Sequence, residues 1–337
     1  ICELDEIFEA HKNDHKTKAA FSRIRYICGS RTLYKAARSQ IYKTREFNAQ
    51  ENLKFYAKNL GAFNEIPNIR QEPDLKNDLG GTNDIYYLNC ALNGFENEIS
   101  MRSQALKFID EKELSALNLA ADFILCVKSA QNLSSDSDVF DPAKLNEITA
   151  LMQTKSKKTQ ENSSVISQKL FSCMHSVAVF SRYLVASFYR SKFKSGAKFN
   201  ELRAGRLGNG FYRFESTIYV PLHARPKSLV SVLKQLLTLG DTAYKFDVSA
   251  IFYIKRARIN KNDFEESAEL FKQILRRNHA HCIIKALLDA EALLGIVKPL
   301  EHASHLAEFD GYHKFTVGEH CVLSVKFAEN IKDKFVK

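Results

Sequence analysis

The sequence predicts a mainly α protein, a helical bundle with a small β-hairpin insertion, on three observations. Apolar residues recur at the spacing of an amphipathic helix over most of the 337 residues. One stretch, residues 211–220 (FYRFESTIYV), instead alternates apolar and polar side chains, which is typical of strands. Hydrophobic residues make up 45% of the chain and charged residues 26%, the balance of an ordinary globular protein.

Each helix is expected where this apolar spacing is continuous. The first half predicts helices over residues 33–42, 49–60, 103–129 and 166–189, and Asp141-Pro142 is the start signal of another that runs to residue 152. The polar segment 156–164 has no periodicity and is expected to be a loop. A hairpin with residues 205–210 at its turn follows, and then helices over residues 228–239, 247–258, 264–277 and 280–294.

Charge and cysteine content define a broad class. The net charge of +10 is spread over the whole length among acidic residues, so it predicts a basic, solvated surface rather than a nucleic-acid groove. The seven cysteines form no C-x-x-C pair, which fits reduced thiols. The most apolar stretch, residues 174–189, is interrupted by Arg182 and is not expected to span a membrane. We expect a cytoplasmic protein, and Ile1 in place of a starting methionine indicates a fragment or a processed product.

Two short motifs have the spacing of metal ligands. Asp136-Ser-Asp138 is the D-x-D pair with which nucleotidyltransferases hold a divalent metal, but no strand precedes it, so an exposed loop without a metal is predicted. His279-Ala-His281-Cys282 is a candidate metal pair or nuclease motif. Two residues apart on a helix, the imidazoles would diverge by roughly 200°, so a helix junction is predicted there instead.

Glycines and histidines mark two further places. Gly80-Gly81 precedes a helix expected near Asn83, where such a pair either cradles a phosphate or is an ordinary turn. His313 and His320 are two helical turns apart, but the glycines at 311 and 318 argue against one continuous helix. We expect His313 in a loop and His320 inside the following helix, as a candidate metal ligand.

Residues 72–85 (EPDLKNDLGGTNDI) resemble a segment of the bacterial PII-protein uridylyltransferase/uridylyl-removing enzymes, E-P-N-[IV]-K-x-x-x-G-G-L-R-D-I. The matching positions, without a gap, are Glu72, Pro73, Leu75, Lys76, Gly80, Gly81, Asp84 and Ile85. Asp74 and Asn83 replace the family's asparagine and arginine. In the family this segment packs beside the transferase active site. The resemblance therefore implies that Lys76, Gly80, Gly81 and Asp84 line or brace a nucleotide site.

The two flanks extend the resemblance. Residues 19–36 are similar to a strand and turn of the family's nucleotidyltransferase domain, with Arg23 where the family has an aspartate. A cation there would repel a metal ion, which puts transferase activity in doubt. Residues 294–320 are similar to the start of the family's HD phosphohydrolase domain, with Asp310, His313, Thr316, Val317 and His320 in register. His320 is then implied as a metal ligand, and Asp310 and His313 as residues of the HD entrance.

The resemblance implies three parts: the end of a nucleotidyltransferase domain (1–60), a helical domain with its β insertion near 205–221 (61–294), and the start of an HD domain (295–337). The family moves UMP from UTP, with Mg²⁺, onto a tyrosine of the PII signalling protein, and hydrolyses that bond with a metal such as Mn²⁺. No His-Asp dipeptide occurs in the sequence, so the remaining HD ligands are expected outside it, and this segment alone is expected to be inactive. The alternative is a catalytically degenerate helical regulator or nucleic-acid-binding scaffold.

Overall fold

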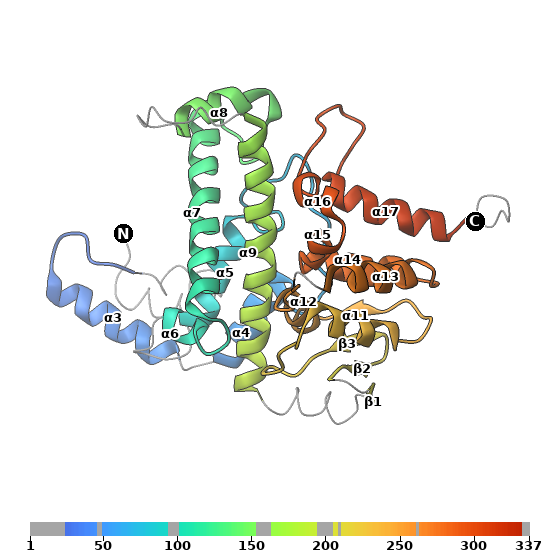
Figure 1. Cartoon of the computed structure of the whole chain (residues 1–337). Coiled ribbons are helices and arrows are strands. Elements are labelled where there is room, and N and C mark those ends of the chain that lie inside the picture. Colours follow the sequence, from blue (N-terminus) through green and yellow to red (C-terminus); the bar gives the residue numbers. More distant parts are fainter. Residues whose placement is uncertain are drawn as a thin grey trace.

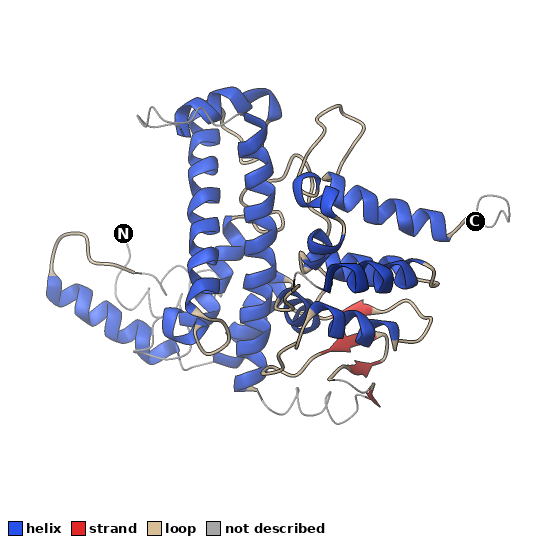
Figure 2. Ribbon diagram, viewed as in Figure 1, coloured by secondary structure: helices blue, strands red, loops and turns tan. Residues whose placement is uncertain are grey.

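A computed structural model describes residues 24–45, 49–93, 101–152, 163–193, 205–207, 210–260 and 263–331. Helices dominate these ranges, and the few strands form one small sheet, as Figure 2 shows. The predicted mainly α class is confirmed.

The N-terminal half is built on two long helices, α7 (Glu111–Ser134) and α9 (Ser163–Lys192), which stand side by side in Figure 1. The turn η1 (Pro142–Lys144) and α8 (Leu145–Met152) lie between them in sequence and pack at one end of the pair. α4 (Ala49–Leu60) and α5 (Thr82–Asn93) pack on α9, the short α6 (Met101–Ala105) packs on α5, and α3 (Arg31–Arg45) lies at the outer edge of this half.

The C-terminal half is a cluster of shorter helices. In chain order they are α11 (Leu229–Leu237), α12 (Val248–Lys255), α13 (Phe264–Leu275), α14 (Ala280–Asp289), α15 (Ala292–Ile296), α16 (Lys298–Ala303) and α17 (Val317–Glu329). α12 packs against α9 and so joins this half to the first. α14 lies between α12 and α17, which places α17 on the outside of the molecule, with its end beside the C-terminus in Figure 1.

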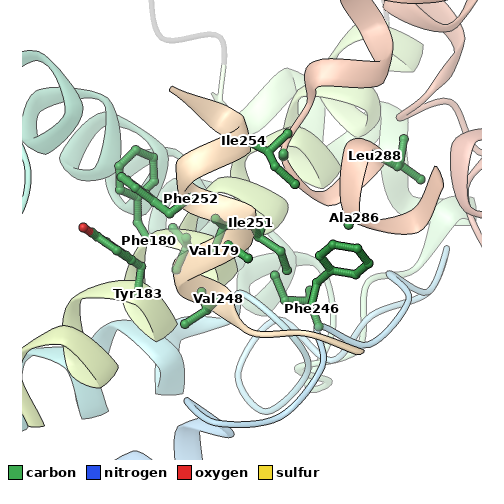
Figure 3. Close-up of a cluster of buried hydrophobic side chains, with 14 of the residues drawn as sticks. Val179, Phe180, Tyr183, Phe246, Val248, Ile251, Phe252, Ile254, Ala286 and Leu288 are labelled. Atoms are coloured by element: carbon green, nitrogen blue, oxygen red, sulfur yellow. The ribbon is translucent and has the colours of Figure 1, made fainter. Parts of the chain in front are cut away.

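The hydrophobic core is continuous across the two halves because α9 is buried around nearly its whole circumference. Its residues from Val177 to Phe188 are all buried, which a helix enclosed by neighbours on every side requires. In the cluster drawn in Figure 3, Phe252 of α12 stacks on Tyr183 of α9 with ring centroids 3.8 Å apart. Phe180 meets the same Phe252 ring edge-on.

A buried ion pair also fixes α12 against α9. Asp247 caps α12 by accepting from the Ser249 N–H (2.9 Å), and Arg190 of α9 donates to both carboxylate oxygens (2.9 and 2.7 Å). Burial alone would raise the pKa of Asp247, but Arg190 and the hydrogen bonds from Ser249 hold it below its ordinary value. The carboxylate therefore stays ionised although the side chain is only 3% exposed.

The sheet corrects the predicted hairpin. β2 (Tyr212–Phe214) and β3 (Thr217–Tyr219) do pair antiparallel within the predicted stretch, but the turn is at Glu215-Ser216, where Glu215 has φ 51°. Residues 205–210, predicted as the turn, instead contain β1 (Gly205–Arg206), which pairs with β2. β4 (Lys245–Phe246) pairs parallel to β3, with Phe246 opposite Ile218.

Two predicted helices are divided. The stretch 103–129 is interrupted after Ala105, and α7 begins afresh with a capping box formed by Asp110 and Glu113. The stretch 280–294 breaks at Glu291, whose φ of 58° lies in the left-handed region. Of the predicted loop 156–164, residues 156–162 lie outside the described residues, whereas Ser163 and Ser164 already belong to α9.

Among the described residues, α9 is a helix long and apolar enough to cross a membrane, but 83% of its apolar window is buried inside the protein, as in a core helix. Near the N-terminus, residues 24–28 form no strand, although the family segment that they resemble has one. Arg23 lies outside the described residues.

Candidate functional site

The Gly80-Gly81 turn is packed against protein backbone. Gly80 has φ +74°, and a Cβ added to it would lie 1.9 Å from the carbonyl oxygen of Met174 in α9. A Cβ on Gly81 would lie 2.8 Å from the Leu75 carbonyl oxygen. Both positions therefore need glycine because the chain passes closely over α9 and over itself.

The backbone N–H groups of this turn already have acceptors. Gly80 donates to the Asp84 carboxylate (2.8 Å), and Gly81, Thr82 and Asn83 donate to carbonyl oxygens at 2.9 Å. A phosphate cradle at a helix N-terminus needs N–H groups that point outward and are not used internally. The geometry therefore supports a bracing role for the two glycines rather than direct phosphate contact.

Asp84 is buried beneath the turn and paired with Arg182. The Arg182 Nη1 atom donates to Asp84 Oδ2 at 2.8 Å, and the two side chains are 7% and 9% exposed. Asp84 thus links the Gly-Gly turn to the centre of α9. Lys76, by contrast, is exposed, and of the four residues assigned to the nucleotide site it alone presents its charge to solvent.

Residues 70–75 hold three distant parts of the chain together. Arg70 forms an antiparallel bridge with Phe315, and the Gln71 side chain donates to the Phe315 carbonyl at 2.7 Å. Asp74 bridges in the same way to Val139, and Leu75 donates to the Asp138 carbonyl at 2.8 Å. We call residues 70–75 the strap. It connects the segment 72–85 to Phe315, which belongs to the other resembling segment, 294–320.

The D-x-D pair lies on a loop, as predicted. Helix α7, not a strand, precedes it, and Asp136 is exposed. Asp138 pairs with Lys128 of α7, so a lysine occupies the position beside the carboxylate that a metal would need.

Asp310, His313 and His320 come together on the surface at the start of α17. Asp310 accepts from the backbone N–H groups of Tyr312 (2.9 Å) and His313 (3.0 Å), and its other oxygen lies 2.8 Å from His313 Nδ1. Those backbone hydrogen bonds lower the pKa of Asp310 to about 2. His320 lies in α17, as predicted, and is exposed, with its ring centroid 5.3 Å from that of His313.

Glu308 joins this group. One ligand atom each from Glu308, Asp310 and His313 lies within 4.8 Å of the others. His320 lies beside these three residues through its contact with the His313 ring. We call Glu308, Asp310, His313 and His320 the entrance cluster.

A cavity of about 230 Å³ lies between α14, α17 and residues 65–68. Acidic and basic side chains both line it. Its polar lining includes Glu65, Tyr244, His281, Cys282, Lys285, Asp289 and Lys326. Lys285 donates to Asp289 and, at 3.3 Å, to Glu319, whose other oxygen has no hydrogen-bond partner among the described residues.

One ammonium therefore serves two buried carboxylates. Burial would lower the pKa of Lys285, but Asp289 and Glu319 raise it above its ordinary value, so the ammonium is kept. Burial raises the pKa of Asp289 to about 7; Lys285 opposes this rise and the charge of Glu319 adds to it. The Asp289 carboxyl therefore titrates near neutral pH.

Cys282 is placed like a nucleophile but is not activated as one. Its sulfur lies 3.3 Å from His281 Nε2, and His281 Nδ1 lies 2.5 Å from the Glu329 carboxylate, an order of groups seen in thiol catalysis. Burial, together with the charges of Glu329 and Glu65, raises the pKa of the Cys282 thiol to about 11. The thiol is therefore protonated at neutral pH, which argues against nucleophilic catalysis.

A second buried network lies deeper, between α9 and α15. His175 lies 2.8 Å from the Asp289 carbonyl, and burial lowers the pKa of His175 to about 3. Burial alone would raise the pKa of Glu291, but the Lys255 ammonium lowers it to about 2. His175 is thus a buried neutral imidazole, and Lys255 keeps the half-buried Glu291 ionised, which is a structural arrangement.

Several residues of these clusters are not evident from the sequence. Arg182 meets Asp84 from 98 positions away, and Glu329 reaches His281 from 48 positions away, so no local pattern could pair them. Lys285 and Asp289 are four residues apart, the spacing that pairs charges on a helix, so the sequence does indicate this ion pair.

Comparison of the chain with protein-family models, with curated proteins and with solved structures gives no match.

Proposed function

We propose that the chain is a segment of a bifunctional PII-protein uridylyltransferase/uridylyl-removing enzyme, and that the entrance cluster belongs to the metal-dependent hydrolase of that enzyme. One observation carries the proposal. Asp310, His313 and His320, which the resemblance matches position by position, lie together in space on one exposed surface, with an ionised carboxylate oriented toward an imidazole. The three-domain division at residues 60 and 294 is part of the same proposal.

The donors of the entrance cluster fit a divalent ion such as Mn²⁺. Glu308 and Asp310 supply carboxylate oxygens and His313 an imidazole nitrogen, a mixed set that first-row divalent ions accept. A bound ion would supply a hydroxide nucleophile for cleavage of the UMP–tyrosine phosphodiester. The chain's own residues prepare the site, because the Tyr312 and His313 amides keep Asp310 ionised and Asp310 in turn orients the His313 ring.

The described residues do not fit the Mg²⁺ of the transferase. Asp138 is paired with Lys128, and no strand carries the D-x-D motif. In this proposal Gly80, Gly81 and Asp84 therefore brace the helical domain beside the transferase site, and Lys76 is the residue available to reach a nucleotide phosphate. The partners proposed are UTP and the PII signalling protein.

Titration of the chain with Mn²⁺, followed by electron paramagnetic resonance of the free ion, tests the hydrolase part. We expect measurable binding that His313→Ala and Asp310→Asn weaken by about tenfold or more, since loss even of a residue that only supports a ligand has effects of this size. His320→Ala is expected to weaken binding as well. His223→Ala, an exposed histidine far along the chain, is the matched control.

Equal Mn²⁺ binding by the wild type and His320→Ala would remove His320 from the proposal, and equal binding by all the variants would refute the entrance cluster as a metal site. A companion assay with labelled UTP, Mg²⁺ and a PII protein is expected to leave the PII protein unlabelled. Label on its tyrosine would contradict our interpretation of the D-x-D loop. Absence of Mn²⁺ binding by the wild type would favour the alternative of a non-catalytic scaffold.

A further inference from the structure

His279 and His281 lie close together although a helix would separate them. His281 is in the first turn of α14, but His279 is the residue before the helix and has φ 58° and ψ 26°, in the left-handed region. The reversal of backbone direction at His279 brings the two imidazole rings to 6.4 Å between centroids, at 63° to each other. The predicted helix junction is thus present, and it brings the pair together.

The third group comes from the end of α17. The Glu329 carboxylate accepts from the backbone N–H of His281 through Oε1 (2.9 Å), and its Oε2 lies 2.5 Å from His281 Nδ1. One ligand atom each from His279, His281 and Glu329 lies within 4.8 Å of the other two. In tetrahedral coordination with bonds of about 2.0 to 2.2 Å, ligand atoms stand about 3.3 to 3.6 Å apart. To close the set, the exposed His279 side chain must rotate, and the Glu329 carboxylate must move by about 1 Å from His281 Nδ1, with which it now pairs.

We propose that His279, His281 and Glu329 bind a Zn²⁺ ion. Two imidazoles and one carboxylate are the ligand set that Zn²⁺ accepts with a fourth position left open, whereas Mg²⁺ and Ca²⁺ favour oxygen ligands throughout. His281 also lines the cavity of about 230 Å³, so the ion would lie at the edge of a partly open cavity with polar and apolar side chains in its lining. Such an ion would join the start of α14 to the end of α17.

The backbone at His279 supports a functional reason for this arrangement. A residue other than glycine in the left-handed region costs of order 1 kcal/mol, and such positions persist where the surroundings hold them. A side-chain cap of α14 does not offset this cost, because the His279 side chain makes no capping hydrogen bond. A metal that ties the His279 ring to His281 and Glu329 would account for it.

The competing explanation is that Glu329 only caps α14, and the variants are chosen to separate the two. Asn tolerates a positive φ, so His279→Asn keeps the backbone and removes the imidazole. Glu329→Gln keeps an acceptor for the His281 N–H and removes the charge. His313→Ala removes a ligand from the entrance cluster and is the control for Zn²⁺ bound there.

Zn²⁺ binding to the metal-free chain is measured by competition with a chromogenic chelator. Each ligand variant is made in the His313→Ala background, which removes the entrance cluster. We expect His313→Ala to bind Zn²⁺, and added His281→Ala, His279→Asn or Glu329→Gln each to lower that affinity by more than about 100-fold. Zn²⁺ is also expected to raise the melting temperature of His313→Ala, but not of the variants that add a ligand substitution to it. Unchanged affinity in both the His279→Asn and the Glu329→Gln variants of this background, or no Zn²⁺ binding that survives His313→Ala, would overturn the proposal.

Discussion

Replacing Gly80 by alanine separates a structural role of the Gly-Gly turn from a phosphate-binding one. At φ +74° an alanine costs about 1 to 2 kcal/mol because its Cβ crowds the following carbonyl. The new Cβ would also lie 1.9 Å from the Met174 oxygen, 2.5 Å from its carbonyl carbon and 2.7 Å from its Cα. Relief requires α9 to move, and overpacking of this kind typically costs about 1 to 3 kcal/mol more.

Gly311→Ala is the matched control. Gly311 has nearly the same φ, +77°, but no atom lies within 4 Å of the position that its Cβ would occupy. It therefore reports the backbone cost alone. The difference between the two variants, about 1 to 3 kcal/mol, measures the close approach of the turn to α9.

Urea unfolding, followed by far-ultraviolet circular dichroism and by tyrosine fluorescence since the chain has no tryptophan, gives both free energies of unfolding. We expect Gly80→Ala to be the less stable variant. The slope of its unfolding free energy against urea concentration, the m value, should be unchanged. A Gly80→Ala protein as stable as Gly311→Ala would refute the packing argument. If that protein had also lost affinity for UTP, the phosphate interpretation of the glycine pair would replace it.

Three further outcomes follow from the buried charges. Asp247→Ala is expected to lower the free energy of unfolding by about 1 to 3 kcal/mol, because it removes the cap of α12 and the hydrogen bonds to the half-buried Arg190, and urea unfolding measures the loss. Arg182→Met should cost about 3 to 5 kcal/mol because it leaves the buried Asp84 carboxylate without its cation, and the double variant with Asp84→Asn should recover part of this loss in a double-mutant cycle. The raised pKa of Asp289, about 7 in the folded protein against about 3.9 unfolded, favours the protonated form in the fold. Its contribution to stability is therefore full below about pH 4 and declines as pH rises through about 7, and Asp289→Asn should flatten this decline in unfolding curves measured from pH 5 to 8.

The sequence predicts the helices better than it predicts their ends and their partners. α4 has the predicted bounds because its apolar spacing is continuous and Gly61 follows it. The break at Glu291 is not predictable in the same way, since glutamate favours helices and only tertiary packing imposes its left-handed backbone. β4 has two residues, too few for any alternating pattern to indicate a strand.

The candidate sites also differ in whether local or distant contacts form them, and only the local ones are predictable from the sequence. Asp310 and His313 are three residues apart, so a local turn brings them together and a sequence motif can indicate their contact. The other groups depend on contacts across the fold, such as Asp84 with Arg182 or His281 with Glu329, and no spacing rule indicates them. For the His279–His281 pair the spacing argument was misleading because it assumed that both residues are helical.

The strap has a consequence for how the protein is made. Gln71 emerges from the ribosome 244 residues before Phe315, whose carbonyl its side chain will contact. At about 5 to 20 residues per second, the strap waits roughly 12 to 50 seconds for that partner. During this interval its pairing with Val139 is already available, since residue 139 follows much sooner. Closure onto Phe315 therefore follows the synthesis of α9 and α12, whose contact already joins the two halves of the described chain.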